Sequence, residues 1–180
     1  MTYSLTNDQQ IIFEKIIEDI EEILNPETIG ATTYLSLTGS AGTGKTYLSS
    51  AIINHLVSVK NLTVGVLAPT HQAVGVIRDG VNLKHKNLDF ATIHKYLSLK
   101  PEIDNETGEQ KFKKQHNKIK RDSNGEIIKK VYKEVLIVDE SSMIGQGLFD
   151  FIIEEVDKGN SKCVLFIGDA CQLFPIEMGG

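Results

Sequence analysis

One stretch of eight residues has the spacing of a phosphate-binding loop. Residues 39–46 read GSAGTGKT and match the pattern G-x-x-x-x-G-K-[ST] at every fixed position. Glycines in this pattern let the backbone curl, so that several N–H groups point inward toward phosphate oxygens. The lysine would reach the β- and γ-phosphates of a nucleoside triphosphate, and the threonine hydroxyl would bind Mg²⁺. The predicted phosphate-binding residues are Gly39, Ser40, Ala41, Gly42, Thr43, Gly44, Lys45 and Thr46.

Two acidic residues follow an apolar segment later in the chain. Residues 134–138 (EVLIV) predict a buried strand, and Asp139 and Glu140 come directly after it. Ligands of parallel sheets bind at the carboxyl ends of the strands, so this pair is expected opposite the glycine-rich loop. Asp139 would then hold Mg²⁺ through a water, and Glu140 would act as the general base on an attacking water. The alternative is a pair of solvated acids at the end of a strand.

A glutamine follows another predicted strand at residues 162–167. Gly168 at the end of that strand permits a close backbone approach, and Gln172 comes four residues later. Gln172 is placed to contact the γ-phosphate and to sense whether it is present. The alternative is a glutamine in a solvated loop.

The remaining elements alternate between helices and strands. Apolar residues at helical spacing predict a helix over Leu5–Leu24, where Thr6 and Gln9 form a capping-box pattern. Apolar strands separated by helices indicate an α/β fold whose parallel sheet is covered on both faces. The segment 99–132 interrupts this order, because it is polar and carries two turn signals that favour hairpins. The other predicted elements are strands at 32–38 and 62–68 and helices at 47–56, 70–81, 92–97 and 147–156.

Length and composition indicate one domain of 180 residues. No apolar run approaches the length of a membrane span, no signal pattern is visible, and a cytoplasmic location is the expectation. The formal net charge is −5, yet residues 111–133 hold nine Lys or Arg against two acids. That basic segment is either a solvated loop or a surface that contacts phosphates.

The order of these motifs resembles that of superfamily 1 DNA helicases, most closely the RecD/Dda-like branch that moves 5′ to 3′ on single-stranded DNA. The phosphate loop is similar to motif I, with Ser40 where many relatives have proline. Residues 139–143 (DESSM) are similar to motif II, and residues 168–175 look like motif III. Residues 68–73 (APTHQA) look like motif Ia, and residues 91–95 (ATIHK) resemble the element that follows it. The resemblance implies a RecA-like P-loop NTPase domain, with ATP and Mg²⁺ as cofactors.

Several roles follow from this resemblance alone. Gln9 looks like the adenine-reading glutamine of the Q motif, although it could simply complete the capping box, and the two roles can coexist. The basic hairpin segment lies where relatives carry a pin that splits the duplex, and Phe112 is a candidate for stacking on a base. Phe112 could equally pack the hairpin's own core, and His94 could be a buried structural histidine. The predicted contacts to single-stranded DNA are Pro69, Thr70, His71, Thr92, His94 and Phe112.

The resemblance also predicts what this chain lacks. Residues 1–98 plus 133–180 would form the first RecA-like motor domain, with 99–132 as an inserted pin-like subdomain. A second RecA-like domain, in a longer chain or a separate one, would supply the arginine finger. By itself the chain is expected to bind nucleotide but to hydrolyse it poorly. The alternatives are a nucleotide-dependent DNA-binding module that needs a partner chain, and a P-loop kinase with a small-molecule acceptor.

Overall fold

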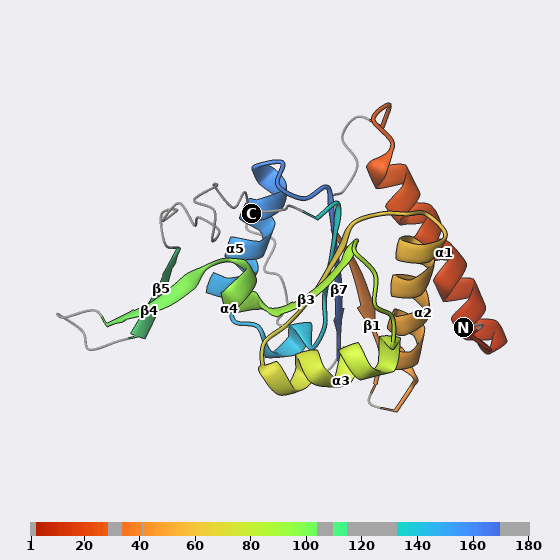
Figure 1. Cartoon of the computed structure of the whole chain (residues 1–180), viewed down its shortest axis with the longest axis horizontal. Coiled ribbons are helices and arrows are strands. Elements are labelled where there is room, and N and C mark those ends of the chain that lie inside the picture. The colour runs from red at the N-terminus through yellow and green to blue at the C-terminus, as the bar shows by residue number, and fades with distance from the viewer. Residues whose placement is uncertain (1–2, 29–33, 41, 104–109, 115–132, 170–180) are drawn as a thin grey trace, which may run out of the picture.

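A five-stranded parallel sheet forms the centre of the protein (Figure 1). The computed structural model describes residues 3–28, 34–40, 42–103, 110–114 and 133–169. Every pair of neighbouring strands in this sheet is parallel, and the strand order is β1-β7-β6-β2-β3. The strands are β1 (Tyr34–Thr38), β2 (Val64–Ala68), β3 (Leu88–Thr92), β6 (Val135–Val138) and β7 (Cys163–Gly168).

Helices cover both faces of this sheet. On one face α1 (Asn7–Leu24), α2 (Lys45–Ser58) and α3 (His71–Val81) pack into one core, and on the other α4 (Ile93–Tyr96) and α5 (Gln146–Asp157) pack into a second core (Figure 1). Alternate residues of the central strands serve the two cores. Val135 and Ile137 face the first core, and Leu136 and Val138 face the second. All four side chains of β6 are therefore buried, which is why the segment is apolar throughout.

A short antiparallel pair of strands stands apart from the sheet. It consists of β4 (Leu99–Ile103) and β5 (Gln110–Lys114). In Figure 1 this hairpin projects away from the body of the molecule, beyond α4. The prediction of a hairpin in this segment is confirmed for these two strands, while residues 104–109 and 115–132 lie outside the described residues.

The predicted elements match the structure closely, with three main differences. The first helix begins at Asn7 because Thr6 is its N-cap, and the helix after the phosphate loop begins at Lys45 instead of residue 47. Strand β3 was not predicted from the sequence. Within the described part of the chain it is an edge strand that pairs with β2 alone, and its exposed Asp89 interrupts the apolar pattern.

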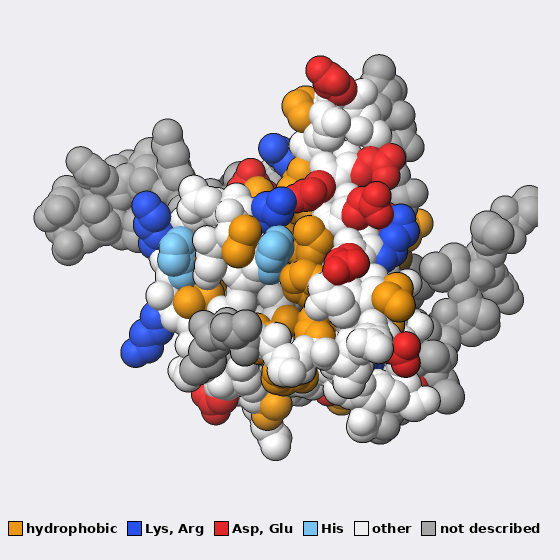
Figure 2. Space-filling model, turned by 90° about the vertical axis from the view of Figure 1, so that its right-hand side faces the viewer, with side chains coloured by type: hydrophobic (Ala, Val, Ile, Leu, Met, Phe, Trp, Pro, Cys, Tyr) orange, Lys and Arg blue, Asp and Glu red, His pale blue; other side chains and the backbone are white. Residues whose placement is uncertain are grey.

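Charge is distributed unevenly over the surface. Acidic side chains gather on the face shown in Figure 2, which is the side of the molecule that carries α1 in Figure 1. Most of the acidic residues of α1 are exposed, including Glu14, Glu18 and Glu22. Such a face repels polyanions. Within the described ranges, no helix combines the length and apolar character needed to cross a bilayer.

Candidate functional site

The glycine-rich loop connects the carboxyl end of β1 to the N-terminus of α2. Gly42 and Gly44 have φ angles of 80° and 82°, in the left-handed region that strongly favours glycine. Gly44 is also the N-cap of α2, so the loop ends where the helix directs its free N–H groups. This arrangement has the features of an anion-binding helix terminus. Ala41 lies outside the described residues.

Lys45 is the first residue of α2, and its side chain curls back over the loop. Its Nζ donates hydrogen bonds to the carbonyl oxygens of Gly39 (2.5 Å) and Ser40 (2.8 Å). The ammonium group is therefore held at the mouth of the loop.

A cavity of about 480 Å³ joins this loop to the predicted acids. The cavity is lined by the loop after β1, the acids after β6 and the end of β7. These segments meet because β1, β7 and β6 are adjacent and parallel, so that their carboxyl ends lie at one edge of the sheet. Sequence reasoning assigned no role to Ser142 or Asp169, and only their position next to the motifs could have indicated them. The lining residues are Gly42, Gly44, Lys45, Thr46, Asp139, Glu140, Ser142, Gly168 and Asp169.

The two acids differ in their surroundings. Burial raises the pKa of Asp139, and the neighbouring Glu140 charge adds to this, while a backbone hydrogen bond at Glu140 and the Lys45 charge oppose it. The backbone N–H of Asp139 donates to the carbonyl of Leu67 on β2 (2.8 Å). Glu140 is exposed and has a φ of 51°, an unfavourable conformation for a residue with a side chain. Strain of this kind persists where the surrounding structure enforces it, often at functional sites.

Oxygen donors for a hard cation lie on both sides of the cavity. The side chains of Thr46 and Asp139 both line it, and hydroxyl and carboxylate oxygens suit Mg²⁺. Among the described residues, no group of three or more His, Cys, Asp or Glu could form a metal site by itself. One hydroxyl and one carboxylate are the kind of sparse protein donor set with which Mg²⁺ binds when waters and substrate phosphates supply its other ligands.

Gly168 at the end of β7 lies against the segment that carries the acids. A Cβ at this position would lie 2.5 Å from Ser141 Oγ and 3.1 Å from the backbone nitrogen of Ser142. The Gly168 carbonyl also accepts a hydrogen bond from the N–H of Gly39 (3.4 Å). The close approach expected from the sequence is therefore present, and it connects β7 to both sides of the cavity.

Replacing Gly168 with alanine is expected to destabilise the protein by about 1–3 kcal/mol, because the added methyl group overpacks this contact. Ser141→Ala alone should be nearly neutral, since its buried Oγ has no hydrogen-bond partner among the described residues. The double variant should recover part of the loss, because it removes the closest clash. Urea unfolding of the four proteins measures the coupling. Strict additivity of the two changes would contradict the proposed contact.

Gln9 lies beside the loop and outside the set of cavity-lining residues. Its side-chain Oε1 accepts a hydrogen bond from the backbone N–H of Thr6 (3.1 Å). The backbone N–H of Gln9 donates to Thr6 Oγ1 (3.3 Å), and these two bonds confirm the capping box. A Cβ on Gly44 would lie 2.5 Å from Gln9 Nε2, so the amide group rests against the loop. The cap leaves the Nε2 group available for a second role.

The residues predicted to contact DNA lie at the carboxyl ends of β2 and β3, except for Phe112, which lies on β5. These ends are adjacent because Ala68 and Thr92 are register partners. Thr70 and His71 are exposed at the start of α3, where Thr70 Oγ1 accepts from the N–H of Ala73 (3.1 Å). Thr92 is only 7% exposed and its hydroxyl caps α4, so its position fits a structural role better than a direct contact.

His94 and Phe112 pack against each other, with ring centroids 4.4 Å apart. The contact joins α4 to β5. Phe112 is 37% exposed, and the Nε2 atom of His94 is buried without a hydrogen-bond partner among the described residues. Phe112 therefore packs against α4 and remains partly exposed, while stacking on a base stays a prediction.

The basic segment contributes less free positive charge than its composition indicates. Lys133 is buried and its Nζ lies 2.6 Å from Asp89, and Lys114 is paired with acids of α5. Lys113 is exposed and forms a surface pair with Glu102. The remaining basic residues of the segment lie outside the described side chains, as does Gln172.

The parallel sheet and the glycine-rich loop facing an acid pair define the chain as a RecA-like P-loop domain. The description "AAA domain" belongs to the family profile that matches residues 22–177. The ATP-dependent DNA helicase Dda of Enterobacteria phage T4 is 30% identical over 182 residues, covering 99% of this chain and 35% of that protein. An uncharacterized protein of Acanthamoeba polyphaga mimivirus is 33% identical over 177 residues, covering 93% of this chain and 33% of that protein.

A solved structure gives the same result for the fold. The Pif1 helicase of Candida albicans superposes with a TM-score of 0.58 at 23% identity, covering 97% of this chain and 34% of that one. The chain belongs to the AAA domain family, and it is similar in sequence to Dda and in fold to Pif1. It spans about a third of the length of these relatives.

Proposed function

We propose that this chain is the ATP-binding first motor domain of an ATP-dependent translocase or helicase that acts on single-stranded DNA. The observation that carries the proposal is the cavity that combines the loop around Lys45 with Asp139 and Glu140. A cavity with only the loop would support nucleotide binding. The acid pair adds the groups that hydrolysis requires.

Each predicted residue of the nucleotide site then has a role. The loop N–H groups and Lys45 bind the phosphates, and Gln9 would contact the adenine from beside the loop. Thr46 and Asp139 would hold Mg²⁺, which supplies charge neutralisation at the phosphates. Glu140 would accept a proton from the attacking water, and Gln172 would contact the γ-phosphate. Catalysis of this kind depends on positioning and electrostatic stabilisation more than on covalent chemistry.

The proposed path of the DNA strand crosses the carboxyl ends of β2 and β3. Pro69, Thr70 and His71 follow β2, and His94 follows β3, with Phe112 packed on His94. Aromatic and histidine rings stack on bases, and N–H groups at the start of α3 suit phosphates. The acidic face that carries α1 is a poor alternative, because it would repel the backbone (Figure 2).

We also propose that 1–98 plus 133–180 form the motor domain and that 99–132 form an inserted subdomain. A second RecA-like domain, in cis or in trans, would complete the cleft. Its arginine finger would supply a rate increase that is typically about 10³–10⁵-fold in nucleotide hydrolases. The opening and closing of the two-domain cleft would then move the strand, with 5′ to 3′ polarity expected from the resemblance.

The test is the ATPase activity of the full-length protein with and without single-stranded DNA. Hydrolysis is expected to increase several-fold with the strand, and the strand's affinity should fall steeply with salt. Indifference to single strands would contradict the proposal. Recovery of activity only after a separate domain is added would favour the partner-dependent binding module, and a phosphorylated small-molecule acceptor would favour a kinase.

A further inference from the structure

The β4–β5 hairpin is joined to the body of the protein through both of its strands. Leu99 and Lys114 are register partners at the base of the hairpin. Leu99 is 8% exposed and belongs to the same core as Ile152 and Val156 of α5. Lys114 contacts the acids of the same helix. The base of the hairpin is thus held in the shared apolar core by one strand and to α5 by a charged contact of the other.

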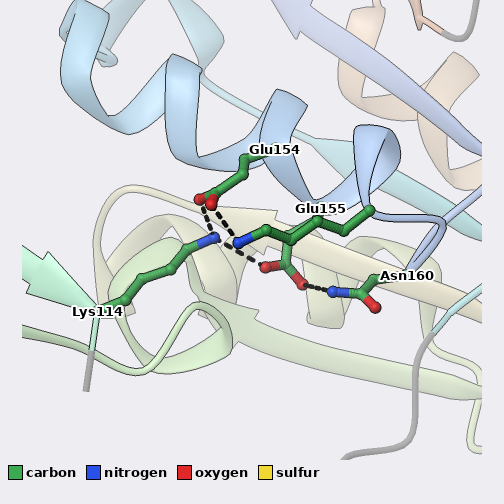
Figure 3. A network of polar contacts seen from close by, with 5 residues as sticks. Lys114, Glu154, Glu155 and Asn160 are labelled. Carbon is green, nitrogen blue, oxygen red and sulfur yellow. Dashed lines mark hydrogen bonds and ion pairs between the residues drawn. The ribbon is translucent and has the colours of Figure 1, made fainter. Parts of the chain in front are cut away.

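The charged contact between Lys114, Glu154 and Glu155 belongs to a network that also includes Lys158 and Asn160 (Figure 3). Lys114 Nζ donates to Glu155 Oε1 (3.0 Å) and to Glu154 Oε2, and it lies 5.4 Å from the centre of the Phe151 ring. The Glu155 side chain is only 4% exposed, and its other oxygen accepts from Asn160 Nδ2 (3.3 Å). Withdrawing Lys114 would break two charged hydrogen bonds, one of them to a buried carboxylate, and this loss is unfavourable.

The neighbouring Lys113 makes no such contact with a buried acid among the described residues. The Lys113 side chain is 76% exposed and pairs with Glu102, itself 58% exposed, across the hairpin, which is a weak surface interaction. Burial acts to lower the pKa of Lys114, but the hydrogen bonds to Glu154 and Glu155 outweigh it and the pKa is raised. Lys114 is therefore held charged in a half-buried site.

Helix α5 in turn adjoins the nucleotide cavity. A 3₁₀ turn, η1 (Ser141–Met143), begins directly after Glu140, and α5 begins three residues after that turn. The ring of Phe149 on α5 stacks on Phe166 of β7 with centroids 5.1 Å apart. A displacement of the acid-bearing segment would therefore be passed to α5 through a short connection and a packed core.

We propose that Lys114 is a positioning residue that fixes the hairpin to α5, so that changes at Glu140 move the hairpin relative to the DNA. The link between Glu140 and movement of the hairpin rests on the proposed function, whereas the attachment of the hairpin to α5 does not. The hairpin acts on the strand, and Lys114 acts only through the hairpin.

The first experiment measures attachment in the full-length protein by hydrogen exchange. Lys114→Met keeps an apolar stem beside Phe151 and removes the charge, and Lys113→Met is the matched control. Loss of these charged hydrogen bonds should increase exchange of the hairpin-base amides roughly ten- to a hundred-fold in Lys114→Met. Lys113→Met should exchange like wild type. Unchanged exchange in Lys114→Met would overturn the proposal, whether or not the protein is a helicase.

The second experiment measures coupling as base pairs unwound per ATP hydrolysed. Lys114→Met is expected to keep its ATPase activity while this ratio falls, and Lys113→Met to keep both. Thermal unfolding of each variant is measured beside the ratio, and Lys114→Met is expected to lose the ratio at temperatures at which it stays folded. A ratio that falls only where the protein begins to unfold would show that Lys114 is merely structural and overturn the positioning role. A wild-type protein without ATPase or unwinding would refute the proposed function instead, and exchange alone would then decide the attachment.

Discussion

Replacing Glu140 with glutamine in the full-length protein is expected to lower the DNA-stimulated turnover of ATP by about 10²–10⁴-fold, which is the usual contribution of a general base. Glutamine is nearly the same size, but it cannot accept a proton from water at neutral pH. The side chain lines the cavity beside Asp139 and is the exposed member of the pair. Nucleotide affinity should change little, so the variant should hold ATP without consuming it. Steady-state kinetics and nucleotide binding together provide the measurement.

Two further variants make this result specific. Glu18→Gln changes an exposed acid of α1, far from the cavity in sequence, and should behave like wild type. Glu140→Gly removes the carboxylate but suits a backbone with a φ of 51°. It should be inactive while its thermal stability is equal to or above that of wild type. Activity of Glu140→Gln within a few-fold of wild type would assign the base to another residue.

Replacing Lys45 with alanine is expected to lower the same turnover by about 10²–10³-fold, since it removes a positive group aimed at developing negative charge. Nucleotide binding should weaken as well, because the lysine contacts ground-state phosphates in the proposed complex. In the structure Lys45 Nζ bridges the carbonyls of Gly39 and Ser40, so the side chain already lies at the mouth of the loop. ATPase assays and fluorescent-nucleotide titration measure the two losses separately.

Lys15→Ala is the matched control for this prediction. Lys15 is exposed on α1 and pairs with Asp19, so its loss should leave both nucleotide binding and hydrolysis unchanged. Lys45→Arg tests geometry, because a planar guanidinium does not replace a compact ammonium in a tight loop. It should also lose most of the activity. A fully active Lys45→Ala protein would mean that hydrolysis occurs at a site other than this cavity.

Local backbone structure followed closely from the sequence. Gly42 and Gly44 adopt positive φ angles at the positions where the loop pattern requires them, and Thr6 and Gln9 form the predicted capping box. The apolar segment at 134–138 contains the buried strand β6. These features are predictable because steric limits, caps and side-chain periodicity act between residues that are close in the chain. The edge strand β3 was missed because it is only partly buried and lacks a clear apolar pattern.

The sequence by itself thus determined the phosphate loop, the acid pair and the α/β class. Only the tertiary structure decided which of these segments meet. The order β1-β7-β6 brings the loop and the acids to one cavity. Gly168 at the end of β7 packs closely against Ser141, next to the acids. The contact between Lys114 and the buried Glu155 could not be predicted from the sequence either, since 41 positions separate the two residues. Such contacts depend on how whole elements pack, and no local pattern encodes the partner that a side chain will find across the fold.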